Sequence, residues 1–198
     1  MNIAQPTTGC IQTAIRWSGL LCLLLVSLSI PHSALAKAFE VEGLSAHKVE
    51  GIFLMDATIH YNFTEEALEA LDSGVPLTLE VHIQLRREGA WVWEADLVDS
   101  RLRYRILHQA LHGLYQVTDL ANGNQHYYAT RKAAFTALGR LRDVQLIQAD
   151  KLQQGESYKL SLKSSLDIEA LPLPLRPLAY LSPAWNLSSE WSQWRLQP

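Results

Sequence analysis

The stretch LTLEVHIQLRREGAWVWEADLV, residues 77–98, holds the clearest structural pattern in the chain. In its first half, Leu, Val and Ile alternate strictly with polar residues, so one face of the segment is apolar and the other is polar. This alternation is typical of an antiparallel sheet with one buried and one solvated face. A turn at residues 87–90 separates it from a second alternating run, which predicts the return strand of a hairpin: Trp91, Trp93, Ala95 and Leu97.

Segments on both sides of this hairpin repeat the β pattern. We expect a strand within residues 49–63, with an irregularity near Asp56. Further strands are expected at residues 100–108, 114–117, 126–130, 144–152 and 157–168.

Two short helices interrupt the predicted strands, each with a threonine at its start and a glycine at its end. Residues 64–74 run from Thr64 to Gly74, and residues 131–138 lie between Thr130 and Gly139. The sequence therefore predicts a mainly β fold, an antiparallel β-sandwich of about seven to eight strands with two short helices. We expect it to form a single domain over residues 37–198.

The first 36 residues have the features of a secretory signal peptide. They contain no acidic residue and one basic residue, Arg16, followed by an apolar run at residues 17–30 and a small-residue site ending at Ala36. The apolar run is shorter than the roughly 20 residues of a comfortable membrane span. We expect cleavage after Ala36 and a periplasmic protein without a stable membrane span; the alternative is an inner-membrane protein anchored by an uncleaved leader.

Charge and cysteine content limit how the protein can be stabilised and which partners it can bind. Both cysteines, Cys10 and Cys22, lie in the leader, so the remaining chain must be stabilised by a hydrophobic core rather than by disulfides. All 20 acidic residues and all but one of the 17 basic residues lie after residue 36, with no basic cluster. A nucleic-acid partner is disfavoured, because phosphate binding relies on clustered Lys and Arg.

No catalytic motif is recognisable. Residues 37–198 lack cysteine, and the chain contains no Gly-x-Ser-x-Gly turn, no phosphate-binding glycine loop and no dinucleotide fingerprint. We therefore predict no catalytic residue and no cofactor, and expect that the protein is not an enzyme.

Two weaker patterns could each mark a functional site, but a structural role at the protein surface also explains them. His108 and His112 are four residues apart and could ligate a metal from one helix face, but no third ligand is recognisable, so surface polar residues are favoured. Asp96 and Asp99 could form an acid pair of glycosidase type, and the solvated edge of a strand explains them equally well.

The C-terminal stretch LPLPLRPLAYLSPAWNLSSEWSQW, residues 171–194, holds four of the eight prolines and three of the six tryptophans. We expect a proline-shaped crossover at residues 171–183, and then a last strand or flap at residues 185–194 whose Trp rings close the sandwich. An exposed part of the crossover, from about Leu173 to Leu181, is our candidate surface for docking a partner. The residues of this stretch that we single out are Leu173, Pro174, Arg176, Pro177, Leu178 and Tyr180.

The tryptophan pair at 91 and 93 has two interpretations. On the predicted strand, Trp91 and Trp93 share a face and could form an aromatic surface for a sugar or a lipid. They could equally belong to the core, which we favour because Ala95 and Leu97 continue the same face.

The C-terminal stretch also resembles the signature of a family of exported bacterial proteins of unknown function, the DUF4390 group. The matching elements are Leu166 with Asp167, the run 171–176, and Trp185, Leu187, Ser189, Trp191 and Trp194. Earlier segments are similar too, at residues 70–81, 91–93, 102–108 and 113–117, so the resemblance covers nearly all of residues 37–198. It implies a single exported β-rich domain of unassigned activity, often encoded beside a membrane sensor histidine kinase.

Three functions remain open at this point. We favour a non-catalytic interaction module of the cell envelope, with an envelope or membrane protein as its partner and a membrane sensor kinase as one candidate. The second is a lipid- or glycan-binding β-domain, and the third is an enzyme of unrecognised type.

Overall fold

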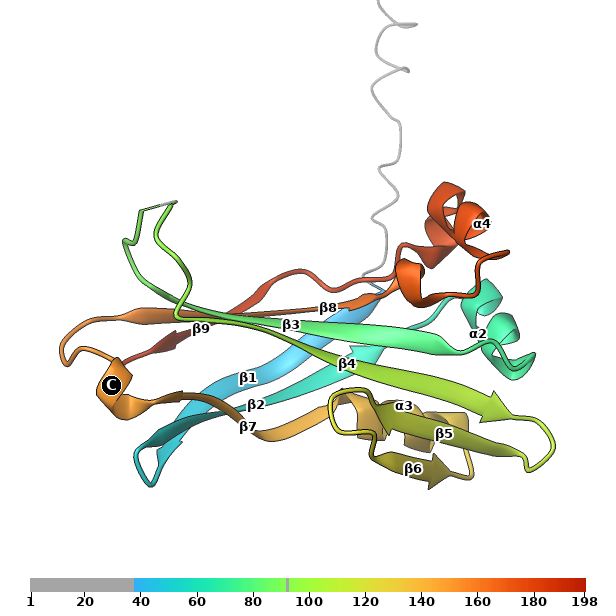
Figure 1. Ribbon diagram of the computed structural model, residues 1–198, viewed down its shortest axis with the longest axis horizontal. Helices are drawn as coiled ribbons and strands as arrows, with labels where there is room; N and C mark the ends of the chain where they lie inside the picture. Colours follow the sequence, from blue (N-terminus) through green and yellow to red (C-terminus); the bar gives the residue numbers. More distant parts are fainter. Residues whose placement is uncertain (1–37, 92) are drawn as a thin grey trace, which may run out of the picture. The chain divides into compact units, whose positions relative to one another are not determined.

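The computed structural model describes residues 38–91 and 93–198, which form two antiparallel sheets (Figure 1). The predicted leader and its cleavage point after Ala36 lie outside the described residues. The described residues contain nine strands and three α-helices. The predicted mainly β, sandwich-like architecture is confirmed, with one or two strands and one helix more than expected.

The smaller sheet has three strands, in the order β1 (Phe39–Val49), β2 (Ile52–Tyr61) and β7 (Arg140–Gln148). The larger sheet has six strands, in the order β6 (Gln125–Tyr128), β5 (Leu114–Asp119), β4 (Val98–Gln109), β3 (Leu77–Arg87), β8 (Tyr158–Leu166) and β9 (Ser192–Leu196). The helices are α2 (Glu65–Asp72), α3 (Arg131–Gly139) and α4 (Arg176–Leu181). Three short 3-10 turns are η1 (Ala149–Lys151), η2 (Ile168–Ala170) and η3 (Pro183–Trp185).

Strand β3 lies near the middle of the larger sheet and organises the core. Its alternating apolar side chains are all buried: Leu77, Leu79, Val81, Ile83 and Leu85. They face the smaller sheet, where Met55, Ala57 and Ile59 of β2 are also buried. The period-two pattern of the sequence is confirmed as one buried and one solvated face.

Both predicted helices form, and their caps are those expected. The Thr64 and Thr130 side chains accept hydrogen bonds from backbone N–H groups three residues on, at the starts of α2 and α3. Gly139 at the end of α3 has a second role, because a Cβ there would lie 1.9 Å from the Ile59 carbonyl oxygen. The absence of a side chain lets the end of α3 press directly on β2.

The predicted irregularity near Asp56 is confirmed. The pairing of β2 with β7 shifts between Met55 and Ala57, and Asp143 on β7 takes a positive φ of 53°. The Asp143 N–H donates to the Asp56 carboxylate at 2.9 Å, so a side chain replaces the missing ladder partner.

The predicted strand at residues 91–97 is wrong. Residues 88–91 and 93–97 lie outside any strand, in the β3–β4 loop, and β4 begins only at Val98, opposite Leu85. The Arg86 guanidinium donates to the Trp91 carbonyl at 2.6 Å and to the Glu94 carbonyl at 2.8 Å. The carbonyl groups of Trp91 and Glu94 therefore accept hydrogen bonds from an arginine side chain, where strand residues would accept them from a neighbouring strand.

The tryptophans of this loop are exposed, which overturns the core interpretation. Trp91 is 67% exposed and Trp93 is 80% exposed, and the two rings stack with centroids 5.0 Å apart and planes at 14°. Ala95 and Leu97, which suggested a buried face, are exposed as well.

The C-terminal segment is more regular than predicted. The expected crossover at residues 171–183 contains helix α4, whose first turn accommodates Pro177 because the first N–H groups of a helix need no intrahelical partner. Trp185 on η3 is buried in the core as expected. Trp191 and Trp194 are only partly covered, at 39% and 44% exposed, so the predicted closure by all three Trp rings is wrong for these two.

Candidate functional site

The candidate docking surface lies at the end of the fold that carries α2 and α4 (Figure 1). Four large apolar side chains there are more than half exposed: Leu173, Leu178, Tyr180 and Leu181. Pro174 and Pro177 are exposed beside them. We call these six residues the α4 surface.

The segment beneath the α4 surface is held firmly to the domain. Leu171 and Ala179 are buried, and the Arg176 Nε donates to the Leu171 carbonyl at 2.8 Å. The Thr64 hydroxyl, at the start of α2, donates to the Ala184 carbonyl at 2.9 Å. The exposed side chains are therefore presented by a braced platform.

Glu169 ties the surface to the preceding turn. The Tyr180 hydroxyl donates to the Glu169 carboxylate, and this hydrogen bond is the main cause that raises the pKa of Tyr180 above its usual value. Arg176 lies 3.7 Å from the same carboxylate. Arg176 therefore braces the segment and does not belong to the apolar surface, and its part in docking stays a prediction.

Leu181 is the last residue of the predicted docking stretch, which runs from Leu173 to Leu181. Helix α4, which the sequence analysis did not predict, groups it with Leu178. In a helix, residues three apart lie on the same side, and Leu181 is 84% exposed, the most of the four.

The surroundings of the α4 surface are acidic. Glu65 and Glu66 in the first turn of α2 are exposed, and α2 contacts η3, which directly follows α4. Glu169 adds a third exposed carboxylate, with a side chain 70% exposed. The apolar surface therefore has a negative rim.

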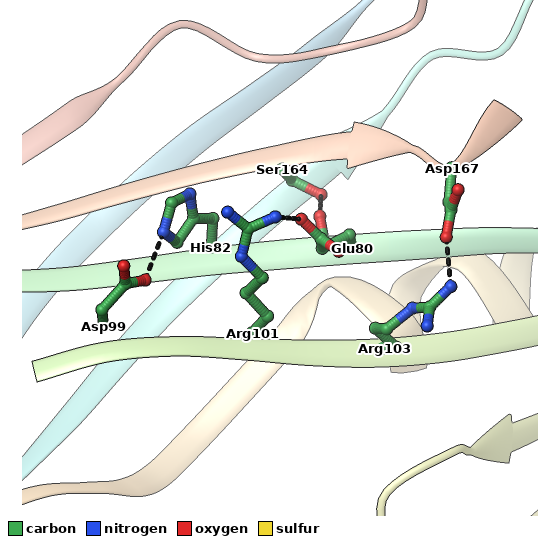
Figure 2. A network of polar contacts seen from close by, with 7 residues as sticks. All are labelled: Glu80, His82, Asp99, Arg101, Arg103, Ser164 and Asp167. Atoms are coloured by element: carbon green, nitrogen blue, oxygen red, sulfur yellow. Dashed lines mark hydrogen bonds and ion pairs between the residues drawn. The ribbon is translucent and has the colours of Figure 1, made fainter. Parts of the chain in front are cut away.

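The outer face of the larger sheet carries a row of ion pairs (Figure 2). His82 lies 2.6 Å from Asp99, Arg101 lies 2.9 Å from Glu80, and Arg103 pairs with Asp167. Each pair joins neighbouring strands or a strand and a turn, and each has a largely exposed member. Such pairs orient side chains on the surface and add little to stability.

The acid pair suggested by the sequence is not assembled. Asp99 pairs with His82, whereas Asp96 lies 3.6 Å from Arg86 Nε in the loop. Each carboxylate therefore has its own cation, and the two do not act on a common point.

The two histidines considered as metal ligands do not lie on a helix. His108 is near the end of β4, where its ring stacks on Tyr115 with centroids 4.6 Å apart, and its Nδ1 lies 3.0 Å from the Asp72 carbonyl. His112 is exposed in the turn that follows. Across residues 38–91 and 93–198, no three metal-ligating side chains are grouped closely enough to hold an ion.

A polar pocket also opens on the outer face of the larger sheet. It has a volume of about 230 Å³ and lies between β3, β8, β9 and the loop at 88–97. Trp191 forms one wall, with its ring 5.2 Å from that of His82. Nothing in the sequence pattern pointed to this pocket, because its residues come from distant segments.

A family model described as Domain of unknown function (DUF4390) matches residues 36–195. No curated protein and no solved structure matches the chain. In the part of the chain that the structure describes, no helix is both long enough and apolar enough to cross a bilayer.

Proposed function

Because the chain belongs to the DUF4390 family, whose description names no activity, we propose from the geometry that it is a non-catalytic interaction domain of the cell envelope. It docks a partner protein through the α4 surface. In this proposal the chain is exported and its leader is removed after Ala36.

The observation that carries the proposal is the exposure of the α4 surface. Leu173, Leu178, Tyr180 and Leu181 fall within nine residues of the chain, and their exposed fractions run from 58% to 84%. Exposed apolar patches on soluble domains commonly mark interaction sites. A braced backbone adds to this, because a preformed surface loses little conformational freedom on binding.

The charge of the rim favours a protein over a lipid bilayer. Glu65 and Glu66 are exposed on α2, which contacts η3 just after α4, and an anionic membrane surface would repel them. The charge of Glu169 is balanced by Arg176. A protein segment with apolar side chains flanked by Lys or Arg complements both the centre and the rim. The extracytoplasmic part of a membrane sensor kinase is one partner of this kind, suggested by the gene neighbourhood of the family.

The test is photo-crosslinking in living cells with a benzophenone amino acid at position 178 or 181. Position 111 is the matched control, because Leu111 is a leucine that is 97% exposed, in the β4–β5 turn, and does not belong to the α4 surface. We expect one envelope protein to be captured from 178 and 181 and not from 111. Binding of the purified pair should then be lost when Leu178 and Leu181 are both replaced by Asp.

Three outcomes would contradict the docking proposal. They are capture of the same protein from position 111, capture of lipid alone, and unchanged binding by the double variant with a native circular dichroism spectrum. Export is tested separately by cell fractionation and N-terminal sequencing, which should find Lys37 as the first residue of a periplasmic protein.

A further inference from the structure

The polar pocket on the outer face has a floor built by strand register. Gln84 on β3 lies opposite Ser161 on β8, and Ser161 lies opposite Gln193 on β9. The small serine between two long amides leaves a depression in the sheet surface. In the next row, Arg86 lies opposite Lys159, so polar groups continue along the floor.

The functional groups of the pocket both donate and accept hydrogen bonds. Gln84 and Gln193 each offer an amide N–H and an amide oxygen, and Ser161 offers a hydroxyl. Arg86 and Asp96, 3.6 Å apart, add a donor and an acceptor whose charges largely cancel. Lys159 also lines the pocket and adds one ammonium group, so the set suits a ligand that carries many hydroxyl groups and no positive charge.

Trp191 gives the pocket one apolar wall. Its ring is 39% exposed although it packs beside His82 and borders buried Ser161. A saccharide ring in the chair form has a flat C–H face that stacks on an indole, while its hydroxyls point outward to planar polar side chains. The pocket thus offers an aromatic wall for the C–H face of a sugar ring and polar side chains for its hydroxyl groups.

The exposed Trp91–Trp93 stack is connected to the same pocket through Arg86. Arg86 lines the pocket and also donates to the Trp91 carbonyl at 2.6 Å. In Figure 1 the β3–β4 loop rises away from β1, β2 and β7, on the outer side of the larger sheet. The loop thus carries a second aromatic platform, which Arg86 joins to the pocket.

We propose that this pocket binds one ring of a β-1,4-linked glycan, stacked on Trp191 and hydrogen-bonded by Gln84, Gln193 and the Arg86–Asp96 pair. The Trp91–Trp93 stack contacts a further ring of the same glycan. The volume of about 230 Å³ is below the roughly 300–1,000 Å³ of clefts for drug-sized ligands, which fits a single ring. The β-1,4 linkage is preferred because its equatorial substituents keep successive rings extended, with flat faces open to aromatic side chains. The glycan site is separate from the α4 surface and stands or falls independently of it.

The test uses isothermal titration calorimetry of the full chain with three tetrasaccharides: the β-1,4-linked tetramer of N-acetylglucosamine, cellotetraose, and α-1,4-linked maltotetraose. We expect binding of at least one β-linked tetramer and much weaker binding of maltotetraose. Replacing Trp191 by Ala should weaken the binding of the β-linked tetramer about five- to tenfold. The control is Trp194→Ala, on the same strand one position beyond pocket-lining Gln193, which should leave binding unchanged.

A second variant tests the loop platform. Trp93→Ala should weaken binding of the tetrasaccharide and leave binding of the matching disaccharide unchanged, because the shorter ligand fills only the pocket. The proposal is overturned if neither β-linked tetramer binds at millimolar concentration, or if Trp191→Ala and Trp194→Ala have equal effects. An equal loss for tetrasaccharide and disaccharide with Trp93→Ala would remove the second platform.

Discussion

The two faces of strand β3 differ in both burial and chemistry. Toward the smaller sheet, Leu79, Val81 and Ile83 are almost completely buried. Toward solvent, Glu80 and His82 form ion pairs with β4, and Gln84 lines a pocket. Neighbouring residues of one strand thus have different roles: one set packs in the core and the other makes polar contacts at the surface.

The magnitudes explain why this division is useful. Full burial of an aliphatic side chain contributes about 1.5–3 kcal/mol, whereas an exposed ion pair contributes between about 0 and 1 kcal/mol. The inner face of β3 therefore accounts for stability and tolerates little change. The outer face can vary with little loss of stability, so it is free to carry recognition.

The largest expected effect tests the inner face directly. Replacing Ile83 by Asp places an unpaired carboxylate between the sheets, and we expect a loss of more than about 4 kcal/mol, enough to prevent folding. The adjacent outer-face change, Gln84→Thr, should alter stability by less than about 1 kcal/mol. Urea unfolding followed by tryptophan fluorescence measures both, and similar losses would remove the contrast between the faces.

A smaller loss of stability is expected at the contact between the end of helix α3 and strand β2. Gly139→Ala places a Cβ 1.9 Å from the Ile59 carbonyl oxygen, which must move, at a cost of about 3 kcal/mol. Gly155→Ala is the control, because Gly155 has a φ of 84° and open space around its Cβ position, so only about 1 kcal/mol of backbone strain is expected. Thermal unfolding of the two variants should separate them, and equal shifts in Tm would show that α3 can move off β2.

An intermediate effect depends on pH. Burial raises the pKa of Tyr61, whose hydroxyl lies 3.3 Å from Ser164 Oγ. Above the unfolded pKa of about 10, the unfolded chain releases a proton that the folded chain retains, so stability should fall as the pH rises. Tyr61→Phe should reduce this alkaline loss, measured as the free energy of unfolding between pH 9 and 11. Tyr127→Phe, at an exposed tyrosine, should keep it, and an unchanged profile in Tyr61→Phe would contradict the assignment.

The smallest effect belongs to the outer face. The coupling free energy between Glu80 and Arg101, 2.9 Å apart, should be below about 1 kcal/mol in a double-mutant cycle with Glu80→Gln and Arg101→Gln. It should decrease further in high salt, because the Arg101 side chain is 57% exposed. A coupling above about 2 kcal/mol that resists salt would mean that the outer face also stabilises the fold.

The contrast between the faces also shows what could be predicted from the sequence. The buried residues of β3 and the caps at Thr64 and Thr130 follow from local pattern, and all were predicted correctly. The loop at 88–97 has the same period of two, but its backbone partner is the Arg86 side chain, which no periodicity can show. A period of two establishes alternation only, and burial depends on what the rest of the chain places against each face.

The site was predictable to the extent that it is continuous in sequence. Leu173, Leu178 and Tyr180 are exposed, as a docking surface requires, and docking itself stays a prediction. Leu181 lies within the predicted docking stretch, but helix α4 was not predicted, because the proline-rich segment was taken to be extended, although Pro177 fits the first turn of a helix. The polar pocket joins β3, β8 and β9, and only the sheet order brings these strands together.

The contacts of strand β1 have a consequence for the timing of folding. As the first strand of the domain it lies against β8 and β9, the last two, and β9 pairs with β8 alone. Contacts between the two ends of a chain form slowly, because the long loop between them must close, at a cost in entropy, before the contacts can stabilise the fold. A nascent chain with this topology stays open until its last two strands have left the ribosome. For the exported protein that we propose, this is an advantage, since a secretion channel admits an extended chain and the sandwich would close only after translocation.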